Sequence, residues 1–222
     1  MNNKILILGS EGFLGTIVVQ KLIKSKKFKN ITGVDICLFG KYNNKFKSFK
    51  LLRTDYSKLN KNFLSKFDYI IDLANVSNDP SSEIDPNFTK NNNYNNKIKF
   101  YRKLKKVKNY IYASSCSVYG MNKNLVNENS KLSPISVYSK SCLKFENFLK
   151  KNYLPFTILR FGTLFGWSKR MRYDIAINKI IRDACYNKSI EVLGGSQYRY
   201  FCFNETAADI IIDAISGSTI YN

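Results

Sequence analysis

Short apolar runs alternate with amphipathic stretches along almost the whole chain. The apolar runs lack the polar alternation of a half-exposed strand, as expected for strands covered on both faces of a parallel sheet. They predict strands at residues 5–8, 31–35, 49–52, 68–74, 109–114 and 156–161. A further short strand is expected at 190–193, and residues 218–222 look like the start of another.

The stretches between these runs have the spacing of helices. They predict helices at residues 16–23, 56–67, 88–106, 136–151, 173–187 and 205–216, whereas two Asp-Pro pairs make residues 75–86 rich in turns. Strands that alternate with helices indicate right-handed crossovers. We therefore expect an α/β fold, a Rossmann-type doubly wound parallel sheet with helices on both faces.

The basic residues are the most unusual feature of the composition, with a formal net charge of +20. Such an excess is typical of proteins that bind nucleic acids or acidic surfaces. Here the lysines are spread over the chain, so we interpret them as a general bias and do not expect nucleic-acid binding. The densest cluster, at 97–108, is interpreted as the solvated face of a helix whose buried stripe is Ile98, Tyr101, Leu104 and Val107.

Other counts exclude several classes of site. The chain has no histidine, which excludes histidine metal sites and Ser-His-Asp hydrolysis and leaves proton transfer to Tyr, Lys, Cys or carboxylates. The five cysteines include no Cys-x-x-Cys pair, so no zinc site or disulfide framework is expected. No apolar run has the length of a membrane span and no signal-peptide pattern is present, so we expect a cytoplasmic protein.

The first strand leads into three glycines at a spacing of three, Gly9-x-x-Gly12-x-x-Gly15, and then into a helix. Glycine allows a tight turn and a close approach to a pyrophosphate, which the helix N-terminus would bind. A turn without any ligand is the alternative. Asp35, at the end of the second strand, lies where such folds place a carboxylate on the adenosine ribose, and it would repel a 2′-phosphate. This pattern predicts NAD and not NADP.

The order of motifs resembles the extended short-chain dehydrogenase/reductase superfamily, in particular its NAD-dependent nucleotide-sugar epimerases and dehydratases. The resemblance rests on the glycine motif, Asp35, Asp55, Asp72-Leu73-Ala74-Asn75, Asn93, Ser114 to Gly120, Tyr138-Ser139-Lys140-Ser141, and Leu159 to Gly166. It implies that Asp55 contacts the adenine and that Leu73 and Ala74 line the nicotinamide ribose. It also implies that the cofactor site includes Gly9, Gly12, Phe13, Leu14, Gly15, Asn93 and Tyr138.

The resemblance further implies two catalytic residues. Ser115 would hydrogen-bond the sugar hydroxyl, and Tyr138 would be the general base while a hydride passes to NAD and back. A free tyrosine has a pKa near 10, so the family places a lysine one helical turn later to stabilise the phenolate. Here that residue is Cys142, and Lys140 and Lys144 lie off the required helix face. We therefore expect impaired catalysis.

Two further departures concern the reaction and the packing. Sugar 4,6-dehydratases carry an Asp-Glu pair where this chain has Cys116 and Ser117, so epimerase or reductase chemistry is favoured over dehydration. Asp72 stands where many relatives have histidine, and we expect it to affect local packing more than chemistry.

The resemblance also suggests how the substrate is held. Arg160, Thr163, Arg172 and Arg199 would gather around a nucleotide-diphosphate sugar, because arginine suits phosphate oxygens, although each arginine could equally be a surface residue. We expect an NAD-binding domain at 1–168 and a partial, truncated substrate-binding region at 169–222, with a short native ending as the alternative. Relatives usually form homodimers through the helices that correspond to 88–106 and 136–151.

Two function classes remain open, with a basic binding module as a distant third. The leading hypothesis is an NAD-dependent nucleotide-sugar epimerase-like protein that Cys142 impairs. The alternative is a non-catalytic NAD-binding homologue or fragment. Both require specific NAD binding, and they differ in turnover.

Overall fold

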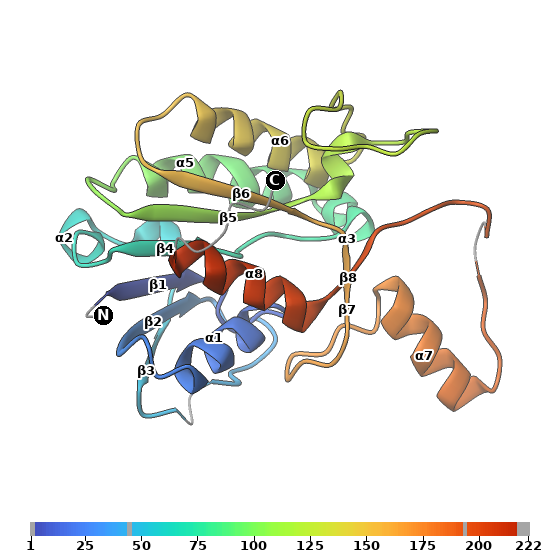
Figure 1. Cartoon of the computed structure of the whole chain (residues 1–222), viewed down its shortest axis with the longest axis horizontal. Helices are drawn as coiled ribbons and strands as arrows, with labels where there is room; N and C mark the ends of the chain where they lie inside the picture. The colour runs from blue at the N-terminus through green and yellow to red at the C-terminus, as the bar shows by residue number, and fades with distance from the viewer. Residues whose placement is uncertain (1–2, 44–45, 193–194, 217–222) are drawn as a thin grey trace.

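A six-stranded parallel sheet forms the centre of the computed structural model, which describes residues 3–43, 46–192 and 195–216 (Figure 1). The strand order is β3-β2-β1-β4-β5-β6. The strands are β1 (Lys4–Leu8), β2 (Asn30–Asp35), β3 (Phe49–Arg53), β4 (Tyr69–Asp72), β5 (Asn109–Ser115) and β6 (Phe156–Phe161). This order reverses direction between β1 and β4, and ligands of such sheets bind at that point, beyond the carboxyl ends of the strands. The Rossmann-type sheet expected from the sequence is confirmed.

Helices cover both faces of the sheet. The helices α1 (Gly15–Lys24) and α8 (Asn204–Ser216) share one apolar core with one face, to which Ile5, Ile7 and Ile211 contribute. The helices α2 (Lys61–Leu64), α5 (Asn96–Tyr101) and α6 (Val137–Lys150) cover the other face, where Leu6 and Leu8 point. Alternate residues of β1 thus enter opposite cores, which explains why the whole strand is apolar.

The long helix expected at 88–106 is divided into three parts. It begins as α4 (Pro86–Lys90), widens into a π-helical segment, η2 (Asn91–Asn95), and ends as α5 at Tyr101. Leu104 and Val107 are buried as expected, although they follow the helix. The expectation for the lysine cluster was wrong at one position, because Lys97 is completely buried. It has a buried acidic partner that comes from a distant part of the chain.

Residues 75–86, expected as turns, contain a short helix, α3 (Asp79–Ile84). Its proline lies in the first helical turn, where the missing N–H would have no helical partner, so the Asp-Pro pair starts a helix. The helix expected at 56–67 is also shorter, since only a 3₁₀ turn, η1 (Tyr56–Lys58), and α2 form there.

The C-terminal part differs most from expectation. Two strands that the sequence did not predict, β7 (Thr163–Phe165) and β8 (Phe201–Phe203), pair in parallel beside α7 (Ala176–Asn187). The strand expected at 190–193 was wrong for residues 190–192, which are irregular, and Leu193 lies outside the described residues. The strand start expected at 218–222 also lies outside them.

The last helix, α8, follows β8 directly and packs against α1, so the end of the region expected at 169–222 contributes to the core of the main sheet. Within the residues that the structure describes, no helix has both the length and the apolar character needed to cross a membrane.

Candidate functional site

The glycine turn connects β1 to α1 and leaves little space for side chains. Gly9 has a φ of +78°, which favours glycine, and its N–H donates to the carbonyl of Val34 at 2.8 Å. A Cβ atom on Gly15 would lie 2.1 Å from the carbonyl oxygen of Gly9. The turn therefore depends on glycine at both ends, whatever ligand it holds.

Helix α1 begins behind this turn without a side-chain cap. Leu14 occupies the N-cap position, and the first turn has no acidic residue. In the described part of the chain, the N–H groups of Phe13 and Leu14 donate to no backbone acceptor. These N–H groups and the positive end of the helix dipole are available to an anion. The turn thus meets the chemical requirements of a dinucleotide pyrophosphate.

The two predicted acidic residues lie at the ends of neighbouring strands. Asp35 ends β2, and its carboxylate accepts hydrogen bonds from the backbone N–H of Glu11 (3.0 Å) and of Cys37 (2.7 Å). The ribose-binding candidate is therefore fixed against the glycine turn. Asp55 follows β3, and it caps η1 by accepting from the N–H of Ser57 at 2.7 Å.

Glu11, inside the glycine turn, has a role that the sequence did not indicate. It is buried, and its carboxylate accepts from the backbone N–H groups of Tyr42 and Asn43 and from the side-chain amide of Asn43. The connection after β2 is thereby tied to the turn. Only the position of a carboxylate between the glycines hinted at this role, because its partners lie more than 30 residues away and two of them are backbone N–H groups.

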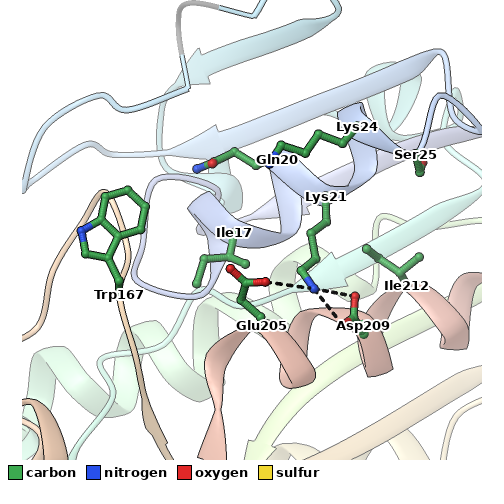
Figure 2. Close-up of a pocket in the computed structure, with 9 residues that line it drawn as sticks. All are labelled: Ile17, Gln20, Lys21, Lys24, Ser25, Trp167, Glu205, Asp209 and Ile212. Atoms are coloured by element: carbon green, nitrogen blue, oxygen red, sulfur yellow. Dashed lines mark hydrogen bonds and ion pairs between the residues drawn. The ribbon is translucent and has the colours of Figure 1, made fainter.

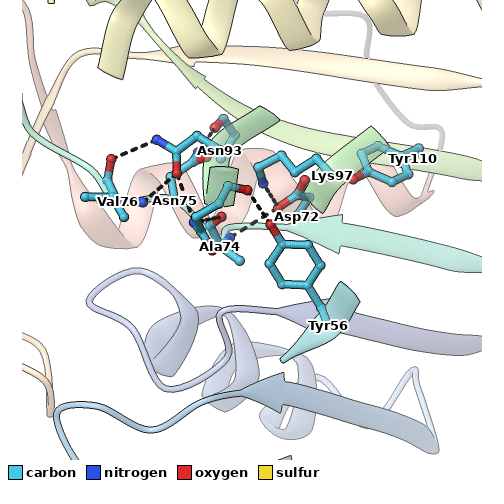
Figure 3. A network of polar contacts seen from close by, with 10 residues as sticks. Tyr56, Asp72, Ala74, Asn75, Val76, Asn93, Lys97 and Tyr110 are labelled. Atoms are coloured by element: carbon cyan, nitrogen blue, oxygen red, sulfur yellow. Dashed lines mark hydrogen bonds and ion pairs between the residues drawn. The ribbon is translucent and has the colours of Figure 1, made fainter. Parts of the chain in front are cut away.

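The floor of the site is the segment after β4. Leu73 and Ala74 pack so closely against the turn that a Cβ on Gly9 would lie 3.0 Å from the amide of Ala74. Both groups of the Asn93 side-chain amide bond the backbone of Val76, at 2.8 and 3.0 Å (Figure 3). Asn93, expected to bind the cofactor, thus positions the loop after β4.

A buried ion pair lies beneath this floor (Figure 3). The Nζ atom of Lys97 donates to the Asp72 carboxylate, and neither side chain is exposed. The same carboxylate accepts from the hydroxyl of Tyr110 at 2.7 Å and from the N–H of Ala74 at 3.2 Å. Asp72 therefore connects α5, β5 and the cofactor floor. Burial lowers the pKa of Lys97, and Asp72 opposes that shift.

The structure brings the two predicted catalytic residues together. Tyr138 lies in the first turn of α6, which Ser136 caps by accepting from the N–H of Ser139 at 3.1 Å. Ser115 ends β5 directly before Cys116, which packs against the buried cluster that contains Tyr138. Burial and the neighbouring Cys142 raise the pKa of Tyr138 well above its usual value, while Ser115 lowers it.

Cys142 lies one helical turn after Tyr138 and is completely buried. Burial raises the pKa of its thiol to about 11, while interactions with Tyr112, Lys97 and Tyr138 oppose that shift. At neutral pH it is therefore a thiol. Lys140 and Lys144 are both exposed, so neither reaches Tyr138 from its own helix as a lysine at position 142 would.

The residues predicted to hold the substrate divide into two groups. Arg160 is engaged within the protein, because its guanidinium binds the buried Glu146 carboxylate at 2.6 Å and the hydroxyl of Tyr119 at 2.9 Å. Arg172 lies nearer the site, where it donates to the hydroxyl of Ser77 at 2.8 Å and pairs with Asp174. Arg160 is thus a structural residue here.

The other two substrate candidates lie around the β7–β8 pair. Thr163 begins β7, and its N–H donates to the carbonyl of Tyr200 at 2.8 Å. Arg199 is exposed, and its charge lowers the pKa of the Cys116 thiol, although burial gives that pKa a net rise.

A shallow groove between α1 and α8 is a separate feature (Figure 2). Lys21 lies in it and pairs with Glu205 (3.5 Å) and Asp209 (2.7 Å), two largely exposed carboxylates. Exposed pairs of this kind contribute about 0–1 kcal/mol. The groove contains none of the predicted site residues, and its two carboxylates are both paired with Lys21.

Comparisons with known proteins agree with this geometry. A family model described as the NAD dependent epimerase/dehydratase family matches residues 5–222. The chain is 28% identical to an uncharacterized UDP-glucose epimerase, YtcB, of Bacillus subtilis (strain 168), covering 97% of this chain and 71% of that protein. It is 31% identical to the protein CapI of Staphylococcus aureus, and the match covers 96% of this chain and 68% of that protein.

The chain is also similar to a solved structure of an epimerase. The UDP-N-acetylglucosamine 4-epimerase of Methanobrevibacter ruminantium M1, in complex with UDP-N-acetylmuramic acid, is 26% identical and superposes with a TM-score of 0.83, covering 100% of this chain and 75% of that one. The glycine turn, Asp35 and the Ser115–Tyr138 pair lie in the matched region. The chain therefore belongs to the NAD dependent epimerase/dehydratase family.

Proposed function

We propose that the chain binds NAD and a nucleoside diphosphate sugar and exchanges a hydride between them as an epimerase. The observation that carries this proposal is the uncapped N-terminus of α1 beside the fixed carboxylate of Asp35, with Ser115 at the end of β5 and Tyr138 in the first turn of α6. Along the sheet edge, the groups suited to the ribose (end of β2), the phosphate (after β1) and the reacting hydroxyl (end of β5) follow one another in that order.

The residues that would hold NAD follow from this arrangement. The turn from Gly9 to Gly15 would hold the pyrophosphate, Asp35 the adenosine ribose, Asp55 the adenine, and Leu73 with Ala74 the nicotinamide ribose. Bound NAD would supply a hydride acceptor. The protein itself would orient the sugar hydroxyl through Ser115 and remove its proton through Tyr138.

The substrate side is supported by chemistry more than by contacts. Arg172 and Arg199, with Thr163 at the start of β7, would hold the diphosphate of a sugar nucleotide, and the region from 169 onward would form part of that side. Arg172 donates to the hydroxyl of Ser77 in the loop after β4, next to the expected nicotinamide site. A cytoplasmic location, supported by five free thiols, and a homodimer belong to the same proposal.

Asp35→Ala is the variant that tests the cofactor assignment. Loss of hydrogen bonds to a charged group costs about 1.5–3 kcal/mol, so NAD affinity should fall about ten- to hundredfold. Isothermal titration calorimetry with NAD and with NADP measures this, and the preference for NAD should shrink in the variant. Asp209→Ala, which removes a carboxylate in the α1–α8 groove, is the control and should bind NAD like the wild type. Equal NAD affinity in Asp35→Ala and the wild type would contradict the assignment.

A non-catalytic NAD-binding protein is the second candidate function. The buried thiol of Cys142 favours it, because a neutral group at that position supplies no charge to the Tyr138 phenolate. The two functions differ in one measurement, the appearance of NADH or of an epimerised sugar when a sugar nucleotide is added to the NAD-loaded chain.

A further inference from the structure

A lysine lies beside the position where this active site lacks one. Among the described residues, Lys97 is the one buried lysine, and it comes from α5, not from the helix that carries Tyr138. Burial of a charged amine is costly, so its side chain must be held by specific partners.

The surroundings of Lys97 place its ammonium between Asp72 and α6. The Nζ atom bonds the Asp72 carboxylate, and it lies 5.2 Å from the ring centre of Tyr112 and 5.7 Å from that of Phe145. Phe145 is on α6, three residues after Cys142, and both side chains are completely buried. The ammonium therefore lies beside a buried side chain of α6 while it pairs with Asp72.

The residues between this ammonium and Tyr138 are also buried. Tyr112, whose ring lies beside the ammonium, has a buried hydroxyl with no hydrogen-bond partner among the described residues. Cys142 lies on α6 three residues before Phe145 and four after Tyr138, and it packs in one buried cluster with Tyr138. Cys142 therefore lies on this helix between Phe145, which is beside the ammonium, and the candidate catalytic tyrosine.

We propose that Lys97 supplies from α5 the positive charge that this site lacks at position 142, and that it acts on Tyr138 through Cys142. Lys97 is then a positioning residue, and the inference rests on the proposed function. The groups that act on the pKa of the Cys142 thiol are Tyr138 and Glu146 from α6, Tyr112 from β5 and Lys97 from α5. Lys97 is the one cation among them, and Arg160 and Ser114 bind the Glu146 carboxylate.

The first experiment measures the charge effect without turnover. The whole chain is labelled with carbon-13 at cysteine Cβ, and the Cys142 signal is assigned by its loss in Cys142→Ser. Its titration is followed over the pH range in which circular dichroism reports a folded chain. Lys97→Met is combined with Asp72→Asn, so that no unpaired buried charge remains.

Removal of the ammonium should raise the pKa of Cys142, giving about tenfold less thiolate at a given pH. Lys144→Met removes an exposed lysine two residues from Cys142 and should leave its titration unchanged. An unchanged Cys142 titration in the Lys97→Met, Asp72→Asn variant would overturn the inference. NAD binding is measured on the same samples, so that a failure of the proposed function is seen separately.

The second experiment uses turnover, with UDP-glucose as the probe and NADH absorbance as the signal. The Lys97→Met, Asp72→Asn variant should react at least about tenfold more slowly, and Cys142→Lys added to that variant should restore the rate. Cys142→Lys alone should not raise the rate, because its ammonium would lie beside that of Lys97. Recovery with Cys142→Lys alone, or full activity without Lys97, would overturn the inference.

Discussion

Lys97→Met alone should lower the free energy of unfolding by about 3–5 kcal/mol, because it leaves the buried Asp72 carboxylate without its cation. Asp72 and Lys97 are both completely buried, so water cannot replace the lost partner. The remaining donors to the carboxylate are the hydroxyl of Tyr110 and the N–H of Ala74. Urea unfolding followed by circular dichroism measures the loss.

The double variant Lys97→Met, Asp72→Asn is the matched control for this prediction. It removes both charges while the amide still accepts a hydrogen bond from Tyr110, so it should recover most of the lost stability. A single Lys97→Met chain as stable as the wild type would contradict a buried ion pair. A double variant that is less stable than the single one would show that the two side chains do not interact as a pair.

Gly15→Ala should have the second large effect, at the glycine turn. Its Cβ would lie 2.1 Å from the carbonyl oxygen of Gly9 and 2.9 Å from the backbone of Ser10, so the backbone itself must shift. Overpacking of this kind costs about 1–3 kcal/mol, and the displaced α1 N-terminus should bind NAD at least about tenfold more weakly. Urea unfolding and calorimetry with NAD measure the two effects.

Gly12→Ala is the comparison for this variant within the same turn. A Cβ on Gly12 would lie 3.2 Å from the Gly9 carbonyl, so a small adjustment accommodates it. Its loss of stability should be clearly smaller than that of Gly15→Ala. Equal stability of both variants and the wild type would show that the close approach of Gly15 to Gly9 does not hold in solution.

The sequence was most informative where one local pattern decides the structure. All of β1 is apolar because its alternate residues enter two different cores, and this explains why the parallel sheet could be recognised. The glycine turn and Asp35 depend on neighbouring backbone groups, so their spacing was sufficient to place them together.

The sequence was least informative where a partner comes from a distant element. Lys97 looked like one of many surface lysines, and only the fold brings it to Asp72, 25 residues away. The strands β7 and β8 are each three residues long, too short for a periodic signal, and 35 residues (166–200) separate them in the sequence. The role of Arg160 could not be predicted either. Its partner, the buried carboxylate of Glu146, lies on α6, and nothing in the sequence around Arg160 indicates that pairing.

The fold also changes what the absence of a lysine at position 142 implies for catalysis. From the sequence it predicted impaired catalysis, because Lys140 and Lys144 lie off the helix face. In the structure a third lysine approaches the same helix from α5. The question of activity therefore depends on Lys97 as well as on Cys142.

Calorimetric titration of the wild-type chain with NAD, in parallel with NADP, tests the central claim most directly. The glycine turn, the free N-terminus of α1 and the fixed Asp35 carboxylate predict one saturable NAD site, with NADP bound at least about tenfold more weakly because Asp35 repels its 2′-phosphate. The absence of saturable NAD binding to the folded chain, or equal binding of the two cofactors, would contradict it.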